Sequence, residues 1–103
     1  MKLEVGMYIR TKDGIISKII SIKNLDERAY LLNGFYFNKD VIKKASYNII
    51  DILEVGDYVN GFPVIHKEND ILKCGLLVQF KENEIKSIVT KEQFESMSYK
   101  LED

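Results

Sequence analysis

Residues 3–6 of this chain read LEVG, and residues 53–56 read LEVG again. The positions that follow match as well, because an aromatic and then a β-branched residue stand at the same spacing after each segment: Tyr8 with Tyr58, and Ile9 with Val59. Self-similarity at a fixed offset is the usual signature of a duplicated structural unit. The repeat therefore predicts two related units of roughly fifty residues each.

A β-hairpin signal follows the repeated segment in both places. It is Asp13-Gly14 in the first half and Asn60-Gly61 in the second. Both dipeptides favour a turn with positive φ between two antiparallel strands. The runs around them are short and rich in Ile, Val and aromatic residues, which is typical of strands. The predicted strands are 7–12, 15–22, 29–37, 41–45, 57–60, 62–67, 72–80 and 85–89.

One segment of the chain has a clear helix start. Thr90 is followed three residues later by Gln93, the spacing of a capping box, in which each side chain bonds the other residue's backbone N–H. This spacing predicts a short helix over 91–97. A turn or helical link is expected at 46–53, and a last strand at 99–101.

These elements predict a mainly β fold. Short, closely spaced strands with glycine turns are typical of small barrels and curled sheets. We expect two tandem SH3-like units packed together, a basic half over 1–52 and an acidic half over 53–103. No Pro-, Gly- or Ser-rich linker separates them, and each is small enough to be marginal alone. The halves form either separate barrels or one compact unit.

The formal charge is distributed unevenly along the chain. Residues 1–50 carry nine Lys and Arg and five Asp and Glu, a charge of +4, whereas residues 51–103 carry six Lys and eleven Asp and Glu, a charge of −5. Such a chain can meet a charged partner with one half, or pair head-to-tail with a copy of itself. Scattered, solvated charge is the simpler interpretation of the same numbers.

The cellular compartment is indicated by two features. A single cysteine, Cys74, allows no internal disulfide and fits a reducing environment. The first residues contain no apolar signal segment, and no apolar run in the sequence is long enough to span a membrane. We therefore expect a cytoplasmic protein.

Residues for catalysis or metal binding are sparse. His66 is the only histidine, and Cys74 stands among Leu72, Leu76 and Leu77, which favours a buried thiol over a reactive one. One His and one Cys cannot build a structural zinc site, which needs four ligands. No glycine-rich phosphate loop is present. The sequence predicts a protein that is not an enzyme and carries no metal or cofactor.

Three segments carry a resemblance to known proteins: 5–11, 49–61 and 88–95. They resemble small accessory proteins of phages and prophages of low-GC Gram-positive bacteria. The resemblance implies a protein that binds a host macromolecule, such as a stoichiometric inhibitor of a host defence complex (in the manner of anti-CRISPR proteins) or of a nucleic-acid-processing complex. It carries no site residues over to this chain.

Two sets of charged residues are candidates for partner binding. In the first interpretation the acidic half imitates a nucleic-acid backbone and fills a basic groove, through Glu68, Asp70, Glu82, Glu84, Glu92 and Glu95. In the second the basic half meets an anionic surface, through Arg10, Lys12, Lys18, Lys43 and Lys44. Direct nucleic-acid binding by that half, and a self-associating structural role in the virion, are the alternatives.

Overall fold

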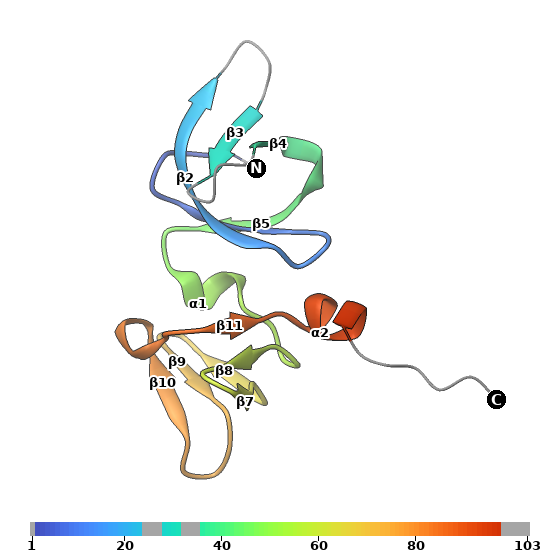
Figure 1. Ribbon diagram of the computed structural model, residues 1–103. Coiled ribbons are helices and arrows are strands. Elements are labelled where there is room, and N and C mark those ends of the chain that lie inside the picture. The colour runs from blue at the N-terminus through green and yellow to red at the C-terminus, as the bar shows by residue number, and fades with distance from the viewer. Residues whose placement is uncertain (1, 24–27, 32–35, 98–103) are drawn as a thin grey trace, which may run out of the picture. The chain divides into compact units, whose positions relative to one another are not determined.

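The computed structural model describes residues 2–23, 28–31 and 36–97. The prediction of a mainly β chain is confirmed, because these residues form small antiparallel sheets joined by short helical turns (Figure 1). The chain divides into two units, residues 1–53 and 54–103. The SH3-like character of each half stays a prediction.

Unit 1 contains one five-stranded antiparallel sheet with the order β4-β3-β2-β1-β5. A 3-10 turn, η1, precedes the last strand, and the short helix α1 follows it within the predicted link. The elements are β1 (Tyr8–Thr11), β2 (Ile16–Lys23), β3 (Arg28–Leu31), β4 (Tyr36–Asn38), η1 (Lys39–Val41), β5 (Ile42–Ser46) and α1 (Ile49–Ile52).

Unit 2 contains two three-stranded antiparallel sheets, with the orders β11-β6-β7 and β10-β9-β8. A 3-10 turn, η2, again precedes the last strand, and a helix follows it. The elements are β6 (Tyr58–Val59), β7 (Phe62–Pro63), β8 (His66–Glu68), β9 (Ile71–Lys73), β10 (Gln79–Lys81), η2 (Glu82–Glu84), β11 (Ile88–Val89) and α2 (Lys91–Met97).

The two LEVG segments fold into the same turn. Gly6 and Gly56 have φ values of +96° and +99°, a region that side chains other than glycine rarely adopt. Each glycine N–H then bonds the carbonyl of a buried residue in the following strand region, Gly6 to Ile19 at 2.9 Å and Gly56 to Val64 at 3.0 Å. The repeat in the sequence is therefore a repeat in backbone geometry.

The matched residues after each turn have matching burial. Ile9 and Val59 are both fully buried, and Tyr8 and Tyr58 are both half-buried. In both units this strand pairs antiparallel with the strand after the 3-10 turn, β1 with β5 and β6 with β11. The two segments thus have equivalent positions within their own units.

Each unit has its own set of buried apolar side chains. In unit 1 four buried side chains form one apolar cluster: Leu3, Ile9, Ile19 and Ile42. The partly buried side chains of Met7, Ile22 and Ala45 pack against this cluster. In unit 2 the buried apolar residues of the sheets and turns are Val59, Val64, Leu72 and Cys74.

Both predicted hairpin turns and the helix cap are confirmed. Gly14, Asn60 and Gly61 have positive φ, as the two turn dipeptides predicted. At the start of α2 the Thr90 N–H donates to Gln93 Oε1 at 3.1 Å, and the Gln93 N–H donates to Thr90 Oγ1 at 3.3 Å. These two hydrogen bonds form the predicted capping box.

Several predicted strand boundaries are wrong. The segment 72–80 forms two strands, β9 and β10, because the backbone turns between them and the Cys74 N–H bonds the Val78 carbonyl at 2.8 Å. The segment 62–67 is divided into β7 and β8 just after Pro63, which lacks an N–H for a ladder bond. The expected last strand, 99–101, lies outside the described residues, as does the middle of 29–37.

Candidate binding surfaces

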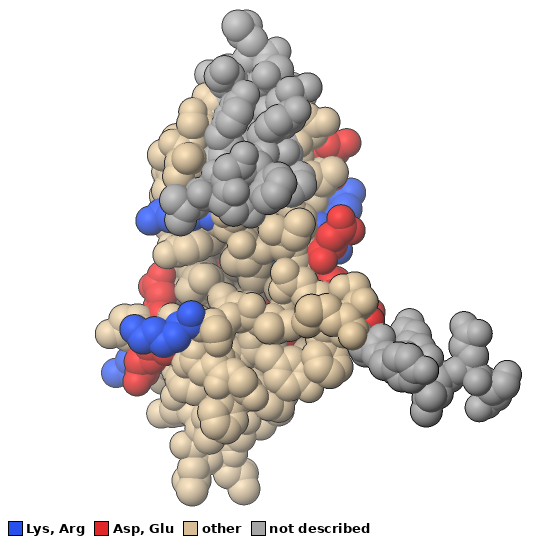
Figure 2. Space-filling view, viewed as in Figure 1, with Lys and Arg blue, Asp and Glu red and all other residues tan. Residues whose placement is uncertain are grey.

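The β9–β10 turn presents two leucines to solvent. Relative to a fully exposed residue, Leu76 is 104% and Leu77 is 96% accessible. The turn segment, residues 74–78, carries no charge. Figure 2 shows the end of unit 2 formed by this turn without charged side chains. We call Leu76 and Leu77 the leucine tip.

The sequence predicted a buried Cys74 thiol surrounded by leucines, and only part of that surrounding is found. Leu72 and Cys74 are buried, as a thiol in apolar surroundings predicts, but Leu76 and Leu77 do not cover that thiol. Burial raises the pKa of the Cys74 thiol. A raised pKa lowers the thiolate fraction at neutral pH, so this cysteine is a poor nucleophile.

The acidic candidates occupy three elements of unit 2 rather than one face. Glu68 and Asp70 lie at the β8–β9 turn, Glu82 and Glu84 in η2, and Glu92 and Glu95 in α2. All are exposed except Glu92, which is half-buried. The structure brings them together in pairs by element.

Glu68 and Glu84 each contact neighbouring residues of unit 2. Glu68 Oε1 is 3.0 Å from Lys73 Nζ and 3.4 Å from His66 Nε2, and the hydrogen bond and charge of Lys73 lower the pKa of Glu68. Glu84 Oε1 accepts a hydrogen bond from the Lys81 N–H at 2.9 Å, and this bond caps the start of η2. The Glu68 charge is therefore partly neutralised, and the Glu84 carboxylate has a structural role.

A pocket is formed by residues of β9, β10 and η2. Its volume is about 390 Å³, and its lining combines one apolar, two amide and two charged side chains: Ile71, Gln79, Lys81, Asn83 and Glu84. Nothing in this set forms a nucleophile with an adjacent base, which covalent catalysis requires.

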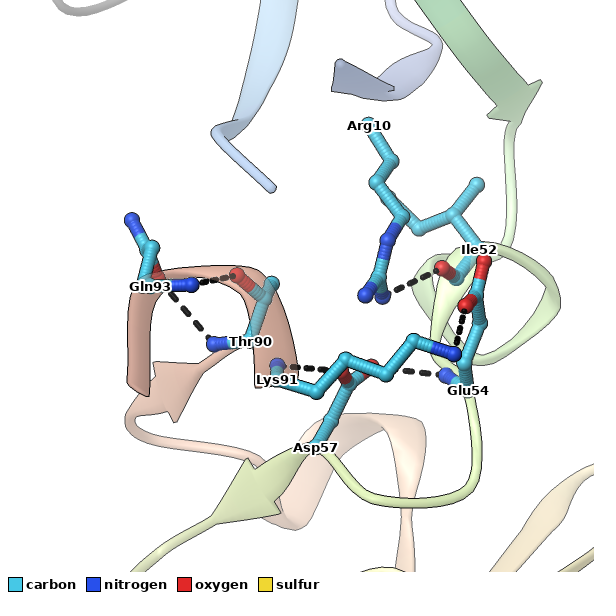
Figure 3. Close-up of polar contacts among 7 residues, drawn as sticks. All are labelled: Arg10, Ile52, Glu54, Asp57, Thr90, Lys91 and Gln93. Atoms are coloured by element: carbon cyan, nitrogen blue, oxygen red, sulfur yellow. Dashed lines mark hydrogen bonds and ion pairs between the residues drawn. The ribbon is translucent and has the colours of Figure 1, made fainter. Parts of the chain in front are cut away.

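The basic candidates include one that was wrongly assigned to a surface. Arg10 is completely buried, and its Nη1 donates a hydrogen bond to the Ile52 carbonyl at 3.1 Å (Figure 3). Its side chain leaves β1 on the face opposite Ile9 and reaches the last residue of α1. Arg10 therefore cannot contribute to an exposed basic face.

The remaining basic candidates are solvent-accessible. Lys12, Lys18 and Lys43 are exposed and Lys44 is half-buried. Lys18 Nζ lies 5.6 Å from the centre of the Tyr8 ring, within cation–π range. These four lysines lie on three elements of unit 1: the β1–β2 turn, β2 and β5.

His66 and Cys74 do not form a catalytic pair. The His66 side chain is 58% exposed and lies beside Glu68, whereas Cys74 is buried. Among the residues that the structure describes, no three His, Cys, Asp or Glu side chains converge as a metal site would require. No helix in the described ranges is both long and apolar enough to cross a membrane.

Sequence reasoning missed a buried polar cluster in unit 2. Asp57 is fully buried, and its carboxylate accepts hydrogen bonds from the Glu54 N–H at 2.7 Å and the Lys91 N–H at 2.9 Å (Figure 3). Lys91 Nζ in turn contacts Glu54 Oε1 at 2.7 Å. The available signal was the position after LEVG, where unit 2 has Asp57 and unit 1 has Met7.

Comparisons of the chain with protein-family models, with curated proteins and with solved structures found no match.

Proposed function

We propose that this chain is a non-enzymatic binding module that acts stoichiometrically on a protein partner with a basic surface, through the carboxylates of unit 2. The proposal includes an SH3-like identity for each unit, supported by the shared order of strands, 3-10 turn and last strand. Small barrels of this kind hold many unrelated functions, so the function is argued from the surface rather than from the fold.

The observation that carries the proposal is the pair of exposed carboxylates on η2. Glu82 and Glu84 are both exposed, and no lysine or arginine lies within that turn. Residues 54–103 carry ten Asp and Glu against six Lys, a formal charge of −4. A fixed negative surface on a small domain steers association with a positively charged groove.

The proposed class of partner is a host complex that binds nucleic acid, such as a defence or nucleic-acid-processing complex. A groove that normally holds a phosphate backbone is lined with Lys and Arg. Exposed carboxylates at fixed positions can occupy such a groove in place of phosphates. The phage or prophage origin, which suggests this class of partner, remains a prediction from the resemblance.

Charge reversal on unit 2 tests the proposal. We expect Glu82→Lys combined with Glu95→Lys to lower the association rate by about tenfold at low salt and to reduce its salt dependence. Glu84 is left intact because it holds the start of η2. The matched control on unit 1 is Lys12→Glu combined with Lys43→Glu, which are also exposed.

The partner is first recovered by affinity capture from a nuclease-treated lysate of a low-GC Gram-positive host, and association rates are then measured at two salt concentrations. A loss confined to the unit 2 variant supports the proposal. An equal loss in both variants, or none in either, contradicts it. Surface changes of this kind usually alter folding stability by only about 0.5 kcal/mol, so folded variants are expected.

A further inference from the structure

The β6–β7 hairpin of unit 2 is closed by a turn of two residues, Asn60 and Gly61. Val59 pairs with Phe62 across the turn, and φ is +53° at Asn60 and +87° at Gly61. Positive φ at both positions is typical of a type I′ turn, in which Asn-Gly is a preferred sequence. A Cβ added at Gly61 would have no atom within 4 Å, so this side of the turn is open space.

The Asn60 side chain is hydrogen-bonded to the segment between η2 and β11. Its Oδ1 accepts from the Lys86 N–H at 2.8 Å and from the Ser87 N–H at 3.1 Å. Its Nδ2 donates to the Glu84 carbonyl at 2.9 Å. The Asn60 N–H in turn bonds the Ser87 carbonyl at 2.9 Å. One amide side chain therefore connects the β6–β7 turn to the backbone that leads into β11.

The same dipeptide carries a chemical reactivity of its own. In Asn-Gly the side-chain amide reacts readily with the next backbone nitrogen, because glycine has no side chain to obstruct the approach. The Gly61 nitrogen bonds to Asn60 Cγ, the Cγ–Nδ2 bond breaks, and Nδ2 takes the Gly61 proton and leaves as ammonia. Water then opens the resulting cyclic imide at either carbonyl and gives aspartate or isoaspartate. Water is the only co-reactant of this deamidation.

We propose that Asn60-Gly61 is a self-modification site of this chain, and that its deamidation is gated by opening of the 84–87 segment. Ring closure brings Cγ to bonding distance from the Gly61 nitrogen and makes this planar carbon tetrahedral, whereas three hydrogen bonds hold the amide in place. The reaction therefore proceeds in the fraction of molecules in which these bonds are open. This inference concerns the chain alone and does not rest on the proposed partner.

Deamidation weakens the link that gates it. An aspartate at position 60 still accepts from the two N–H groups, but it cannot donate to the Glu84 carbonyl. Isoaspartate adds the Cβ carbon to the main chain, which breaks the two-residue turn. Each product also places a new negative charge beside η2. The modified turn is therefore open more often than the original one, and the loss of ammonia makes the change irreversible.

Peptide mass spectrometry of the purified full chain, sampled during long incubation at mildly alkaline pH, tests the proposal. The internal standard is Asn33-Gly34, which lies outside the described residues and begins the same tripeptide, Asn-Gly-Phe, as Asn60. In concentrated guanidinium chloride the two sites should react at equal rates. In buffer, Asn60 should react at least about tenfold more slowly than in guanidinium chloride, because three hydrogen bonds must open first.

Two carboxylate variants of η2 separate the gate from an effect of charge. The Glu84 side chain caps η2 through the Lys81 N–H, and Glu82 is an exposed carboxylate in the same turn. Glu84→Ala should raise the Asn60 rate in buffer about fivefold, because it loosens the turn whose carbonyl holds Nδ2. Glu82→Ala, which removes the same charge, should leave that rate unchanged. Neither substitution should alter the rate in guanidinium chloride, and circular dichroism checks that both variants fold.

Four results would overturn the proposal. Equal Asn60 rates in buffer and in guanidinium chloride would remove the gate. An equal rise in Glu84→Ala and Glu82→Ala would show that charge, and not the link, controls the rate. No reaction of Asn60 in buffer, in the parent chain or in Glu84→Ala, would mean that the folded protein does not modify itself here. Aspartate formed without isoaspartate would exclude the imide route. The comparison of the two solvents uses the parent chain, so it decides the question even if a variant fails to fold.

Discussion

In unit 1 the Glu4 carboxylate accepts a hydrogen bond from the Tyr47 hydroxyl at 2.9 Å, whereas in unit 2 the equivalent Glu54 forms an ion pair with Lys91 Nζ at 2.7 Å. The backbone beneath is nearly identical, as the two glycine φ values show. One turn geometry is thus held from outside by a hydrogen bond from an uncharged phenol in one unit and by an ion pair in the other.

The residue after each LEVG segment also differs, and it changes how the turn is connected to the rest of its unit. The Glu4 N–H points at the Met7 sulfur, 3.3 Å away, and Met7 packs against the apolar cluster. The Glu54 N–H is bonded instead by Asp57, whose carboxylate also bonds the N–H of Lys91, the first residue of α2. Unit 2 therefore joins its repeated turn to its helix through a buried carboxylate, and unit 1 does not use this device.

The buried carboxylate gives the largest expected difference between the units. Asp57→Ala should lower the free energy of unfolding by about 3 kcal/mol, because two partly buried N–H groups lose a charged, buried acceptor. Met7→Leu, at the equivalent position, should cost less than about 1.5 kcal/mol because it conserves volume. Urea unfolding followed by circular dichroism measures both.

Asp57→Asn is the control, because it keeps the size and shape of the side chain and removes its charge. It retains one acceptor oxygen and should have an intermediate effect. If Asp57→Ala costs no more than Met7→Leu, the link between the turn and α2 is not important for stability, and the two units are held in the same way.

The glycines of the two turns should have equal effects. Gly6→Ala and Gly56→Ala each place a Cβ in ordinary contact, 3.5 Å from a Tyr47 ring carbon and 3.6 Å from Lys91 Cδ, so crowding is not the problem. The destabilisation should come from the positive φ, and we expect each substitution to lower the free energy of unfolding by about 1–2 kcal/mol. The measurement is again urea unfolding. Costs that differ by more than about 1 kcal/mol would show that the two turns are not energetically equivalent.

The repeat, the turns and the helix cap were predictable because each depends on residues close together in sequence. Glycine at positive φ, Asn-Gly at a hairpin and Thr-to-Gln spacing at a helix start act locally. The structure confirms Gly61, Asn60 and the Thr90–Gln93 pair in these roles.

The features that sequence reasoning missed depend on contacts distant in sequence. Arg10 looked like a surface cation, but its side chain is buried and bonds the carbonyl of Ile52, which is distant in sequence. Leu76 and Leu77 continue an apolar run, which favours a buried strand, and Gly75 alone hinted at the turn. Asp57 resembled one more acidic residue until its distant partner, Lys91, was placed.

The residues that cap the helices of the two units should have a smaller effect on stability. Asn48 Oδ1 accepts the Ile50 N–H at 2.9 Å at the start of α1, and the Thr90–Gln93 pair starts α2. Asn48→Ala and Thr90→Ala should each cost about 1 kcal/mol in chemical unfolding. Gln93→Ala removes only half of the capping box and should cost less than Thr90→Ala. The reverse order would mean that the Thr90 hydroxyl is not the main cap.

The smallest expected effect concerns ionisation at the turn of unit 1. The hydrogen bond that Tyr47 donates to Glu4, together with the charge of Glu4, raises the pKa of Tyr47 above its ordinary value of 10.0. A raised pKa means that folding favours the protonated phenol. The associated stability is therefore fully present below the unfolded pKa and is lost as the pH rises through the folded pKa. Because Tyr47 is exposed, the change in stability should be slight, and the titration itself is the better measurement. Carbon-13 NMR of the labelled tyrosine ring should show Glu4→Gln moving the Tyr47 midpoint down, while Glu54→Gln, the same change in unit 2, leaves it in place. A Tyr47 midpoint that does not respond to Glu4→Gln would show that its phenol does not bond this carboxylate in solution, and would remove the outer contact that distinguishes unit 1 from the ion-paired unit 2.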